Sequence, residues 1–371
     1  MIWGGMNAMK VDEGLQPVRV HSVANAFWPR RYNRPMGFKD ITDIRCVLHT
    51  RGALPVHSDR ILRAWLAARS LESGSRRHQA VHFLPLAVRN ALPQLANDLA
   101  ALAQIHTQED SVDGSTRLLL RLADGQTVES VQLPGDGLCV STQVGCAVGC
   151  TFCQTGRAGL IRQLGSAEII AQVVLARRLG PVNRVVFMGM GEPAHNLENV
   201  LETIHVLGTL GGIGHKNLVF STVGDRRVFE RLPAGPVRPA LALSLHTTRA
   251  DLRRTLLPKA PDMTPDELVE LGEIYARATG YPIQYQWTLL EGINDTDEEL
   301  AGIVRLLRGK YAMMNFIPYN ASEGLPYRRP APERASRMAG YLHQHGIITR
   351  LRQSAGQDVE GGCGQLRARH V

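Results

Sequence analysis

From residue 138 onward the sequence alternates short apolar runs, which predict β-strands, with longer amphipathic runs, which predict helices. Repeated strand–helix units favour parallel strands joined by right-handed crossovers. The chain is therefore expected to form an α/β fold, either an incomplete barrel or a strongly curved open sheet. The predicted strands cover residues 138–142, 184–188, 217–221, 239–245, 283–290, 313–319 and 347–353, and the predicted helices include 166–178, 197–208, 264–279, 297–308 and 332–345.

The sequence before residue 138 has a different pattern. An apolar stripe at spacings of three and four residues predicts a helix from Ser58, and a second helical stretch covers about residues 86–102, interrupted by Pro93. Two strand-like runs, 118–122 and 127–133, flank an Asp-Gly pair, which is a strong turn signal. This region therefore predicts a small helical domain followed by a β-hairpin.

Residues 1–57 contain no clear periodic pattern, but one segment has an unusual composition. Residues 27–34 interleave aromatic side chains with arginines. Such a segment could stack on bases and pair with phosphates, and it could equally be a plain surface arm or a strap packed on the body of the protein. Cys46 lies in an apolar stretch of this region, where a buried structural thiol is expected.

Three cysteines occur within eight residues, at positions 146, 150 and 153, directly after the first predicted strand of the α/β region. This spacing lets one loop present three thiolates to a single metal centre and leaves a fourth coordination position open. Cysteine thiolates are the usual ligands of iron–sulfur clusters. Structural zinc is the alternative, but it needs four ligands, usually in two short pairs, and the remaining candidates Cys139 and Cys363 are isolated in sequence.

Polar motifs follow several of the predicted strands at their carboxyl ends. In parallel α/β folds these ends meet at one face, where catalytic and binding residues gather. We therefore expect one site at the mouth of the sheet, with the cysteine loop as part of it. The motifs are Gly189–Pro193 after the second strand, Ser221-Thr222 after the third, Ser244–His246 after the fourth and Pro318–Asn320 after the sixth.

Composition limits the setting in which the chain works. Of its 371 residues 44% are hydrophobic, enough for a large core, yet no run approaches the ~18 apolar residues that a membrane span needs. The first residues lack the pattern of a signal peptide, and clustered thiolates need a reducing compartment, so a cytoplasmic location is expected. Lys and Arg (42) exceed Asp and Glu (34), giving a net charge of +8 that suits a polyanionic partner such as RNA.

With these motifs in view, the chain resembles the RlmN/Cfr family of radical S-adenosylmethionine (radical SAM) RNA methyltransferases over about residues 115–368. The cysteine loop alone would fit the whole radical SAM superfamily, whereas Cys139 before it and Cys363 near the end are more restrictive. The segments that carry the resemblance are 139–146, the cysteine loop, 188–193, 244–246, 291–295, 317–320 and 362–366.

The resemblance implies a fold and a domain organisation. The fold would be a partial (β/α)6 barrel of radical SAM type, with a small N-terminal helical domain and a β-hairpin extension. The domains would be an accessory, mostly helical RNA-recognition domain at 1–110, a hairpin linker at 111–137, the partial barrel at 138–355 and a tail at 356–371.

The resemblance also implies an activity: methylation of adenosine at ring carbon 2 or 8 in large-subunit ribosomal RNA, and in some members transfer RNA, with two molecules of S-adenosylmethionine. The first would methylate Cys363. The second would bind one [4Fe-4S] cluster held by the three loop cysteines and yield a radical that activates that methyl group. Cys139 would resolve the protein–RNA adduct through a transient disulfide with Cys363, and Glu129 would be the proton acceptor. A flavodoxin-type protein would supply the electron, and no stable protein partner is implied.

By the same resemblance, seven residues would bind S-adenosylmethionine. Gly191 and Glu192 would hold its methionine amino group, because glycine allows close backbone approach. The nucleoside part would be lined by Ser221, Ser244, Leu245, His246 and Asn320.

The match departs from the family pattern at a few positions. Gln286 stands where the family usually has glutamate, Ala194-His195 replaces a pair of leucines, and Val223 breaks a Ser-Thr-Ser-Gly pattern. Residues 1–110 match only between Asp59 and Leu66. Two other functions therefore stay open: a radical SAM enzyme acting on a protein or small molecule, and a non-catalytic zinc protein that binds RNA.

Overall fold

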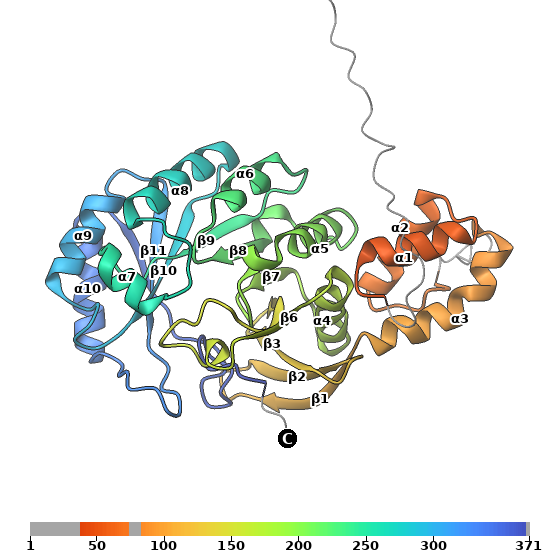
Figure 1. The fold of residues 1–371 in the computed structure, drawn as a ribbon, viewed down its shortest axis with the longest axis horizontal. Helices are drawn as coiled ribbons and strands as arrows, with labels where there is room; N and C mark the ends of the chain where they lie inside the picture. Colours follow the sequence, from red (N-terminus) through yellow and green to blue (C-terminus); the bar gives the residue numbers. More distant parts are fainter. Residues whose placement is uncertain (1–37, 74–82, 369–371) are drawn as a thin grey trace, which may run out of the picture. The chain divides into compact units, whose positions relative to one another are not determined.

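The computed structural model describes residues 38–73 and 83–368 (Figure 1). These residues belong to one compact unit. The segment 27–34, singled out for its aromatic and arginine side chains, lies outside the described residues.

The main sheet has ten strands in the order β1-β2-β3-β4-β7-β8-β9-β10-β11-β12. The seven strands from β4 to β12 all run parallel, as the strand–helix alternation predicted. Because β1 and β12 are the two edges of the sheet, hydrogen bonds between strands do not close it into a complete barrel. The parallel strands are β4 (Gly137–Cys139), β7 (Arg184–Phe187), β8 (Leu218–Thr222), β9 (Ala240–Ser244), β10 (Ile283–Leu289), β11 (Ala312–Pro318) and β12 (Ile348–Leu351).

Helices connect the parallel strands and pack on their outer side, where α8, α9 and α10 follow β9, β10 and β11 in Figure 1. Two of the connecting helices were not predicted. α6 is short and has Pro233 in its last turn, and α7 has only seven residues, so neither shows a sustained helical period. The helices are α4 (Ser166–Leu179), α5 (Leu197–Thr209), α6 (Arg226–Ala234), α7 (Ala250–Leu256), α8 (Pro265–Thr279), α9 (Asp297–Leu307) and α10 (Pro332–Gln344).

The two faces of each parallel strand have different surroundings. On β10, Tyr285 and Trp287 are buried in the main hydrophobic core, while the alternate residues Gln284 and Gln286 line a cavity. This alternation follows from the two-residue period of a strand. The core therefore lies between sheet and helices, and the opposite face of the sheet carries the polar residues of the site.

An antiparallel extension precedes the parallel strands. β2 (Thr116–Leu122) and β3 (Thr127–Leu133) form the predicted hairpin, and β3 pairs with β4. A further strand, β1 (Ala103–Asp110), pairs with β2, although the sequence placed these residues in the helical region. β1 is an edge strand that is mostly exposed after its first residue, so its sequence lacks the apolar alternation that would identify it.

Three helices form the amino-terminal part of the described chain: α1 (Ile41–Thr50), α2 (Pro55–Leu66) and α3 (Leu86–Ala101). α1 was not predicted, and it buries Cys46 as expected. α3 continues through Pro93 instead of being interrupted there. The Ile41 amide donates to Ser166 Oγ at 2.8 Å, which ties α1 to the start of α4.

Two short strands, β5 (Gln143–Gly145) and β6 (Leu160–Gln163), pair antiparallel outside the main sheet and flank the cysteine loop. Single 3-10 turns complete the described structure at 154–156, 193–196 and 215–217. Within the described ranges, no helix combines the length and apolar character needed to cross a membrane.

Candidate active site

The loop between β5 and β6 brings Cys146, Cys150 and Cys153 together. All three pack against an apolar cluster that includes Phe152 and Leu256. Burial raises the pKa of Cys146 to about 12, and burial together with the charges of the other two thiols raises the pKa of Cys150 well above its ordinary value. Without a metal the thiols of Cys146 and Cys150 are therefore neutral, and a bound metal would have to displace their protons.

Backbone contacts fix the course of this loop. Gly145 has a φ of +79°, and a Cβ there would lie 2.0 Å from the Gly159 carbonyl oxygen. The Cys146 amide donates to the same oxygen at 2.9 Å. The Thr151 amide donates to the Leu256 carbonyl at 3.0 Å, so α7 supports the loop.

The donor set suits an iron–sulfur cluster better than a single ion. Among residues 38–73 and 83–368, no three His, Cys, Asp or Glu side chains form a group that could hold a metal ion. Structural zinc would need four such ligands around one ion. Thiolates that bind different irons of a cluster stand farther apart than ligands of one ion, and Cys146 and Cys153 are near enough to Cys150 to raise its pKa. We conclude that the loop fits a three-thiolate cluster.

Glu192 lies at the carboxyl end of β7, next to the cysteine loop. Its Oε1 accepts a hydrogen bond from the Ala194 amide and its Oε2 one from the Val223 amide, each at 3.0 Å. Burial raises the pKa of this carboxyl. Gly191 before it has a φ of +101°, and a Cβ there would lie 2.6 Å from the side chain of Gln143. Gln143 Oε1 in turn accepts from the Glu192 amide at 2.7 Å.

Hydrogen bonds from β10 and the loop after it fix the residues that follow β9. His246 has a φ of 60°, its carbonyl accepts from Asn294 Nδ2 at 2.8 Å, and its Nδ1 accepts from the Thr288 amide at 3.0 Å. Burial lowers the pKa of His246 to about 3, so the ring is neutral.

The Leu245 side chain is buried in the main core, which leaves only its backbone for a ligand. Ser221 and Ser244 are partly buried at the carboxyl ends of β8 and β9.

Asn320 follows β11 and contacts the segment that carries Cys363. Its Nδ2 donates to Ser354 Oγ at 2.8 Å and to the Cys363 carbonyl at 3.0 Å, while its Oδ1 accepts from Arg329 at 3.1 Å. In this conformation the Asn320 amide is occupied by protein groups, so a ligand would have to replace one of them.

Cys139 and Cys363 line one cavity of about 610 Å³. Burial, and next the nearby Cys363 thiol, raise the pKa of Cys139. Burial also raises the pKa of Cys363, against the opposing effects of Ser354 and Arg352. Two residues 224 positions apart in sequence thus present their thiols to the same space, whose volume suits a nucleoside-sized ligand.

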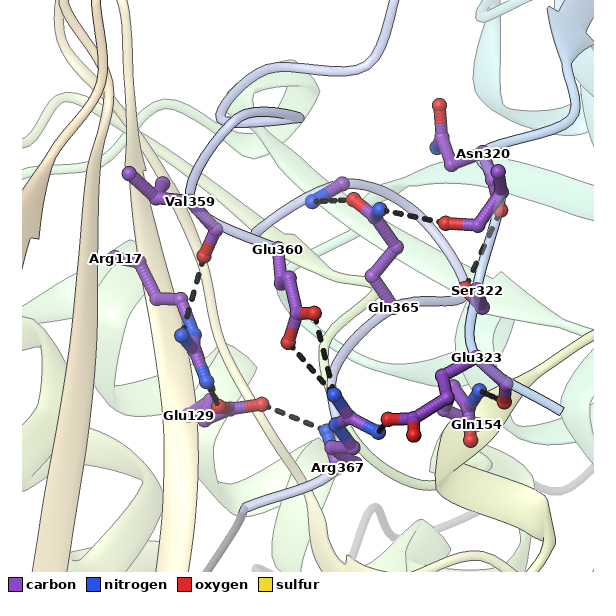
Figure 2. Close-up of polar contacts among 12 residues, drawn as sticks. Arg117, Glu129, Gln154, Asn320, Ser322, Glu323, Val359, Glu360, Gln365 and Arg367 are labelled. Carbon is purple, nitrogen blue, oxygen red and sulfur yellow. Dashed lines mark hydrogen bonds and ion pairs between the residues drawn. The ribbon is translucent and has the colours of Figure 1, made fainter.

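Glu129 occupies a different position. It is fully buried on β3 and is not among the residues that line the cavity. Its Oε1 accepts from Arg117 Nε at 2.9 Å and its Oε2 accepts from the Arg367 amide at 2.8 Å, as Figure 2 shows. The carboxylate is therefore engaged by a guanidinium and by the backbone of the carboxyl-terminal segment.

Sequence reasoning missed Arg253 on α7. This side chain is buried, and its Nη1 donates to the carbonyls of Ser244 at 2.8 Å and Leu245 at 3.0 Å. Its Nη2 donates to the Val223 carbonyl. Burial lowers the pKa of Arg253 to about 10, against the charges of Cys150 and Glu192. A single arginine in a short helix gives no sequence signal that would distinguish it from a surface residue.

The structure also shows the surroundings of the residues at which the chain departs from the family pattern. Gln286 lines the cavity and donates to the Gln284 carbonyl at 3.1 Å. Ala194 is buried, and the carbonyl of His195 accepts from Gln163 Nε2 at 2.9 Å. Val223 supplies the amide that binds Glu192. Only Gln286 among them faces the cavity.

Known proteins match this chain over most of its length. A family model described as the radical SAM superfamily matches residues 140–306. A probable RNA methyltransferase of Azoarcus is 69% identical over 331 residues, 89% of this chain and 95% of that protein. One of Pseudomonas aeruginosa is 65% identical over 326 residues, 87% of this chain and 94% of that protein.

The chain belongs to the radical SAM methyltransferase family. A crystal structure of a radical SAM methyltransferase from Sphaerobacter thermophilus has the same fold, with a TM-score of 0.78 and 33% identity over 90% of this chain and 100% of that one. The resemblance to RlmN/Cfr and the radical SAM fold are thereby confirmed, and the chain is an enzyme. A non-catalytic zinc protein does not fit this family, whose members use a [4Fe-4S] cluster and S-adenosylmethionine.

Proposed function

We propose that this radical SAM methyltransferase methylates a ring carbon of adenosine, carbon 2 or carbon 8, in ribosomal or transfer RNA. The observation that carries the proposal is the shared cavity of Cys139 and Cys363, which provides the two thiols that a methyl-carrier mechanism needs. The relatives named as probable RNA methyltransferases support RNA as the substrate.

Two groups that bind this chain would supply the radical chemistry. One [4Fe-4S] cluster on Cys146, Cys150 and Cys153, together with S-adenosylmethionine, provides the electron and the radical that activate an otherwise inert methyl group. Glu192 and the Gly191 backbone would hold the methionine part of S-adenosylmethionine. The ends of β8 and β9 and Asn320 would contact its nucleoside part.

Cys363 would act as the methyl carrier. Its thiolate accepts a methyl group from S-adenosylmethionine, because a deprotonated sulfur is a competent nucleophile. Burial raises the pKa of this thiol, so its attack has to be coupled to loss of the proton. Once one hydrogen atom has been removed from it, the methyl carbon would join the adenine ring and leave Cys363 covalently bound to RNA. The ring carbon would then give up its own hydrogen as a proton, for which the resemblance implies Glu129 as the acceptor, and one electron would return to the cluster.

Cys139 would release the product. Its sulfur attacks the sulfur of Cys363, an S–S bond forms, and the bond from Cys363 to the new carbon breaks. The electron pair of that bond stays with the carbon, which takes up a proton and becomes the methyl group. The disulfide then needs two electrons from an external thiol reductant before the next turnover.

The cavity offers groups that suit a base and its backbone. Gln284 and Gln286 present amides, which can pair with an adenine edge. Arg184 and Arg352 also line the cavity and add positive charge to it. An adenine inside a folded RNA would have to be flipped out to enter it.

The remaining partners belong to the same proposal. A flavodoxin-type protein would deliver electrons to the cluster. All six cysteines are unpaired thiols, which suits a reducing compartment such as the cytoplasm.

Peptide mass spectrometry on Cys363 tests this function most directly. Protein loaded with its cluster and incubated with S-adenosylmethionine should carry a methyl group on that thiol, and Cys363→Ala should yield no methylated RNA. Cys46→Ala is the matched control, because Cys46 is a buried thiol of α1 outside the cavity. An unmodified Cys363 in loaded protein would favour a protein or small-molecule substrate instead.

A further inference from the structure

Arg253 of α7 is a buried arginine whose hydrogen bonds leave its charge unbalanced. The residue is only 3% exposed. Its guanidinium donates to three backbone carbonyls, those of Ser244, Leu245 and Val223. Carbonyl oxygens satisfy the N–H groups but carry no net charge. Within the described ranges no Asp or Glu forms an ion pair with Arg253, although buried arginines are seldom left without a charged partner.

The negative groups that act on Arg253 belong to the site itself. Burial lowers the pKa of Arg253 to about 10, against the charges of Cys150 and Glu192. Because this pKa is still well above 7, the guanidinium is charged at neutral pH. A buried positive charge thus lies where the thiolate of Cys150 and the carboxylate of Glu192 can feel it.

The helix that carries Arg253 also holds the cysteine loop. Leu256 packs in the same apolar cluster as the loop cysteines, and its carbonyl accepts from the Thr151 amide at 3.0 Å. Just after the helix, the Lys259 amide donates to the Val148 carbonyl at 3.2 Å. The loop backbone is therefore fixed to this segment at two points, so the position of Arg253 is tied to that of the loop.

Val223, the residue after β8, connects Arg253 to Glu192. Its amide donates to Glu192 Oε2 at 3.0 Å, and its carbonyl accepts from Arg253 Nη2. Nη1 of the same guanidinium binds the carbonyls of Ser244 and Leu245 at the end of β9. One planar fork thus holds the ends of two neighbouring strands, and these are the segments that would contact S-adenosylmethionine.

We propose that Arg253 is a positioning residue with two effects: its charge balances the cluster on the loop cysteines and favours reduction, and its fork holds the strand ends that bind S-adenosylmethionine. Three thiolates make a [4Fe-4S] cluster a net anion, and an added electron makes it more negative. Net charge is among the features that set cluster potentials. A fixed positive charge in a poorly solvated site therefore stabilises the reduced form.

This inference rests on the proposed function only for the presence of the cluster and of S-adenosylmethionine. It does not depend on the methyl carrier, on the resolving thiol or on RNA. The potential of the cluster and the affinity for S-adenosylmethionine can both be measured without any substrate RNA.

Reduction potentials of the full cluster-loaded chain test the effect of the charge. In a mediated anaerobic titration, dithionite gives one electron to each cluster, and visible absorption follows the reduced fraction. Arg253→Met removes the charge and should lower the ratio of reduced to oxidised cluster at a given potential by about tenfold, which is about 59 mV for one electron. Arg253→Lys keeps the charge and should stay within about threefold of the wild type.

Arg254→Met is the matched control. Arg254 is the next residue of α7, and its side chain is 66% exposed, with Asp262 at 3.9 Å. The variant loses the same formal charge from the same helix, but water and salt screen that charge. The ratio of reduced to oxidised cluster should therefore change less than about twofold.

The affinity for S-adenosylmethionine tests the effect of the fork. A lysine ammonium lacks the planar set of donors that binds the three carbonyls. Titration calorimetry on the oxidised, cluster-loaded chain should show about tenfold weaker binding in Arg253→Lys, although its potential stays close to that of the wild type. Unchanged affinity in this variant would exclude the fork from the binding of S-adenosylmethionine.

Two results would overturn the effect of the charge. The first is a wild-type potential in Arg253→Met with full iron, and the second is an equal shift in Arg253→Met and Arg254→Met. If Arg253→Met binds no iron, Arg253→Lys decides: normal iron and potential support the charge, and loss of iron would make Arg253 a structural brace only. Failure of the proposed function would appear separately, as an unmethylated Cys363 in protein whose potential still depends on Arg253.

Discussion

His246 combines a φ of 60°, which non-glycine residues rarely adopt, with a buried ring whose Nδ1 is occupied by a backbone amide. Asn294 stabilises this turn by donating to the His246 carbonyl and by accepting from the Leu290 amide at 2.8 Å. The ring can therefore carry a proton only on Nε2, and folding favours the neutral form.

The pH dependence of stability follows from this histidine. Its pKa falls from an ordinary 6.5 to about 3 on folding, so below pH 6.5 the unfolded chain takes up a proton that the folded chain does not. The free energy of unfolding should therefore decrease as the pH falls, by about 2 kcal/mol from this group at pH 5. Denaturant titrations of the metal-free chain at pH 7 and pH 5 would measure it.

His246→Asn is the comparison, because the Asn oxygen can accept from Thr288 and Asn tolerates a positive φ. Its loss of stability between pH 7 and pH 5 should be smaller than that of the wild type by the same amount. Equal losses would show that His246 does not titrate in this way.

Replacement of Cys139 should separate the two halves of the proposed mechanism. Cys139→Ala leaves the methyl carrier in place but removes the thiol that would break its bond to RNA. We expect methyl transfer to Cys363 at a normal level and a covalent protein–RNA species that accumulates to about one per chain. Denaturing gels with labelled RNA would reveal it, and free methylated RNA in normal amounts would exclude Cys139 as the resolving thiol.

At this scale the sequence identified the residues with distinctive chemistry and missed those whose role depends on burial. The three loop cysteines could be found from their spacing, and Cys139 and Cys363, which are isolated in sequence, could be found from the family resemblance. Arg253 could not, because nothing in its neighbourhood indicates that its side chain is buried. The placement of Glu129 away from the cavity could not be predicted either, because strand alternation indicates the face on which a residue lies but not what packs on that face.

The cysteine loop depends on a glycine at the end of β5. Gly145→Ala adds a Cβ that meets the Gly159 carbonyl at 2.0 Å, in a backbone conformation that already disfavours side chains. The loop would have to shift, so we expect iron and sulfide per chain to fall at least about twofold and stability to fall by about 1–3 kcal/mol. Metal analysis after anaerobic reconstitution would measure the first effect.

Gly280→Ala provides a matched control. Gly280 ends α8 with a φ of +75°, yet a Cβ there meets no atom within 4 Å. It should lose only the strain of about 1 kcal/mol and keep a full complement of iron. Equal iron loss in the two variants would mean that backbone strain, and not the contact with Gly159, determines the loop.

The accuracy of element prediction depended on burial. The parallel strands from β7 to β11 were predicted within a few residues because they are largely buried and read as apolar runs. β12 was predicted as well, although only Thr349 of its four residues is buried. β1 was missed because an exposed edge strand needs no apolar residues, and α1, α6 and α7 were missed because they are short. Pro93 did not interrupt α3, since one missing hydrogen bond is tolerated in a helix with a buried apolar face.

The net charge of +8 belongs to the whole molecule and predicts how it should bind RNA. Each phosphate that a cationic side chain neutralises releases a counterion, with a slope of about −0.7 in log affinity against log salt for a single strand. Three such contacts would give about a tenfold loss of RNA affinity when the salt concentration is tripled. Filter binding across a salt series would measure the slope, and salt-independent binding would exclude this electrostatic contribution.

The segment 352–368 after β12, which we call the strap, depends on contacts that local sequence patterns cannot predict. Its bonds join residues more than 230 positions apart, such as Arg117 with Val359 and Glu129 with Arg367. Strand and helix periods carry information over a few residues only. The approach of Cys363 to Cys139 could therefore be expected from the family resemblance, and the contacts that produce it required the structure.

Because the strap adds no strand to the main sheet, the part that would carry the methyl group and the part that would generate the radical are distinct pieces of one chain. The strap is attached through hydrogen bonds and ion pairs to residues of the antiparallel extension, and through Leu366 and Ala368, which are buried in the main core. A synthetic peptide of this sequence is therefore a natural vehicle for semisynthesis. Selenium or an isotopically labelled methyl group could be placed at a single sulfur position while the cluster-binding part is made by the cell.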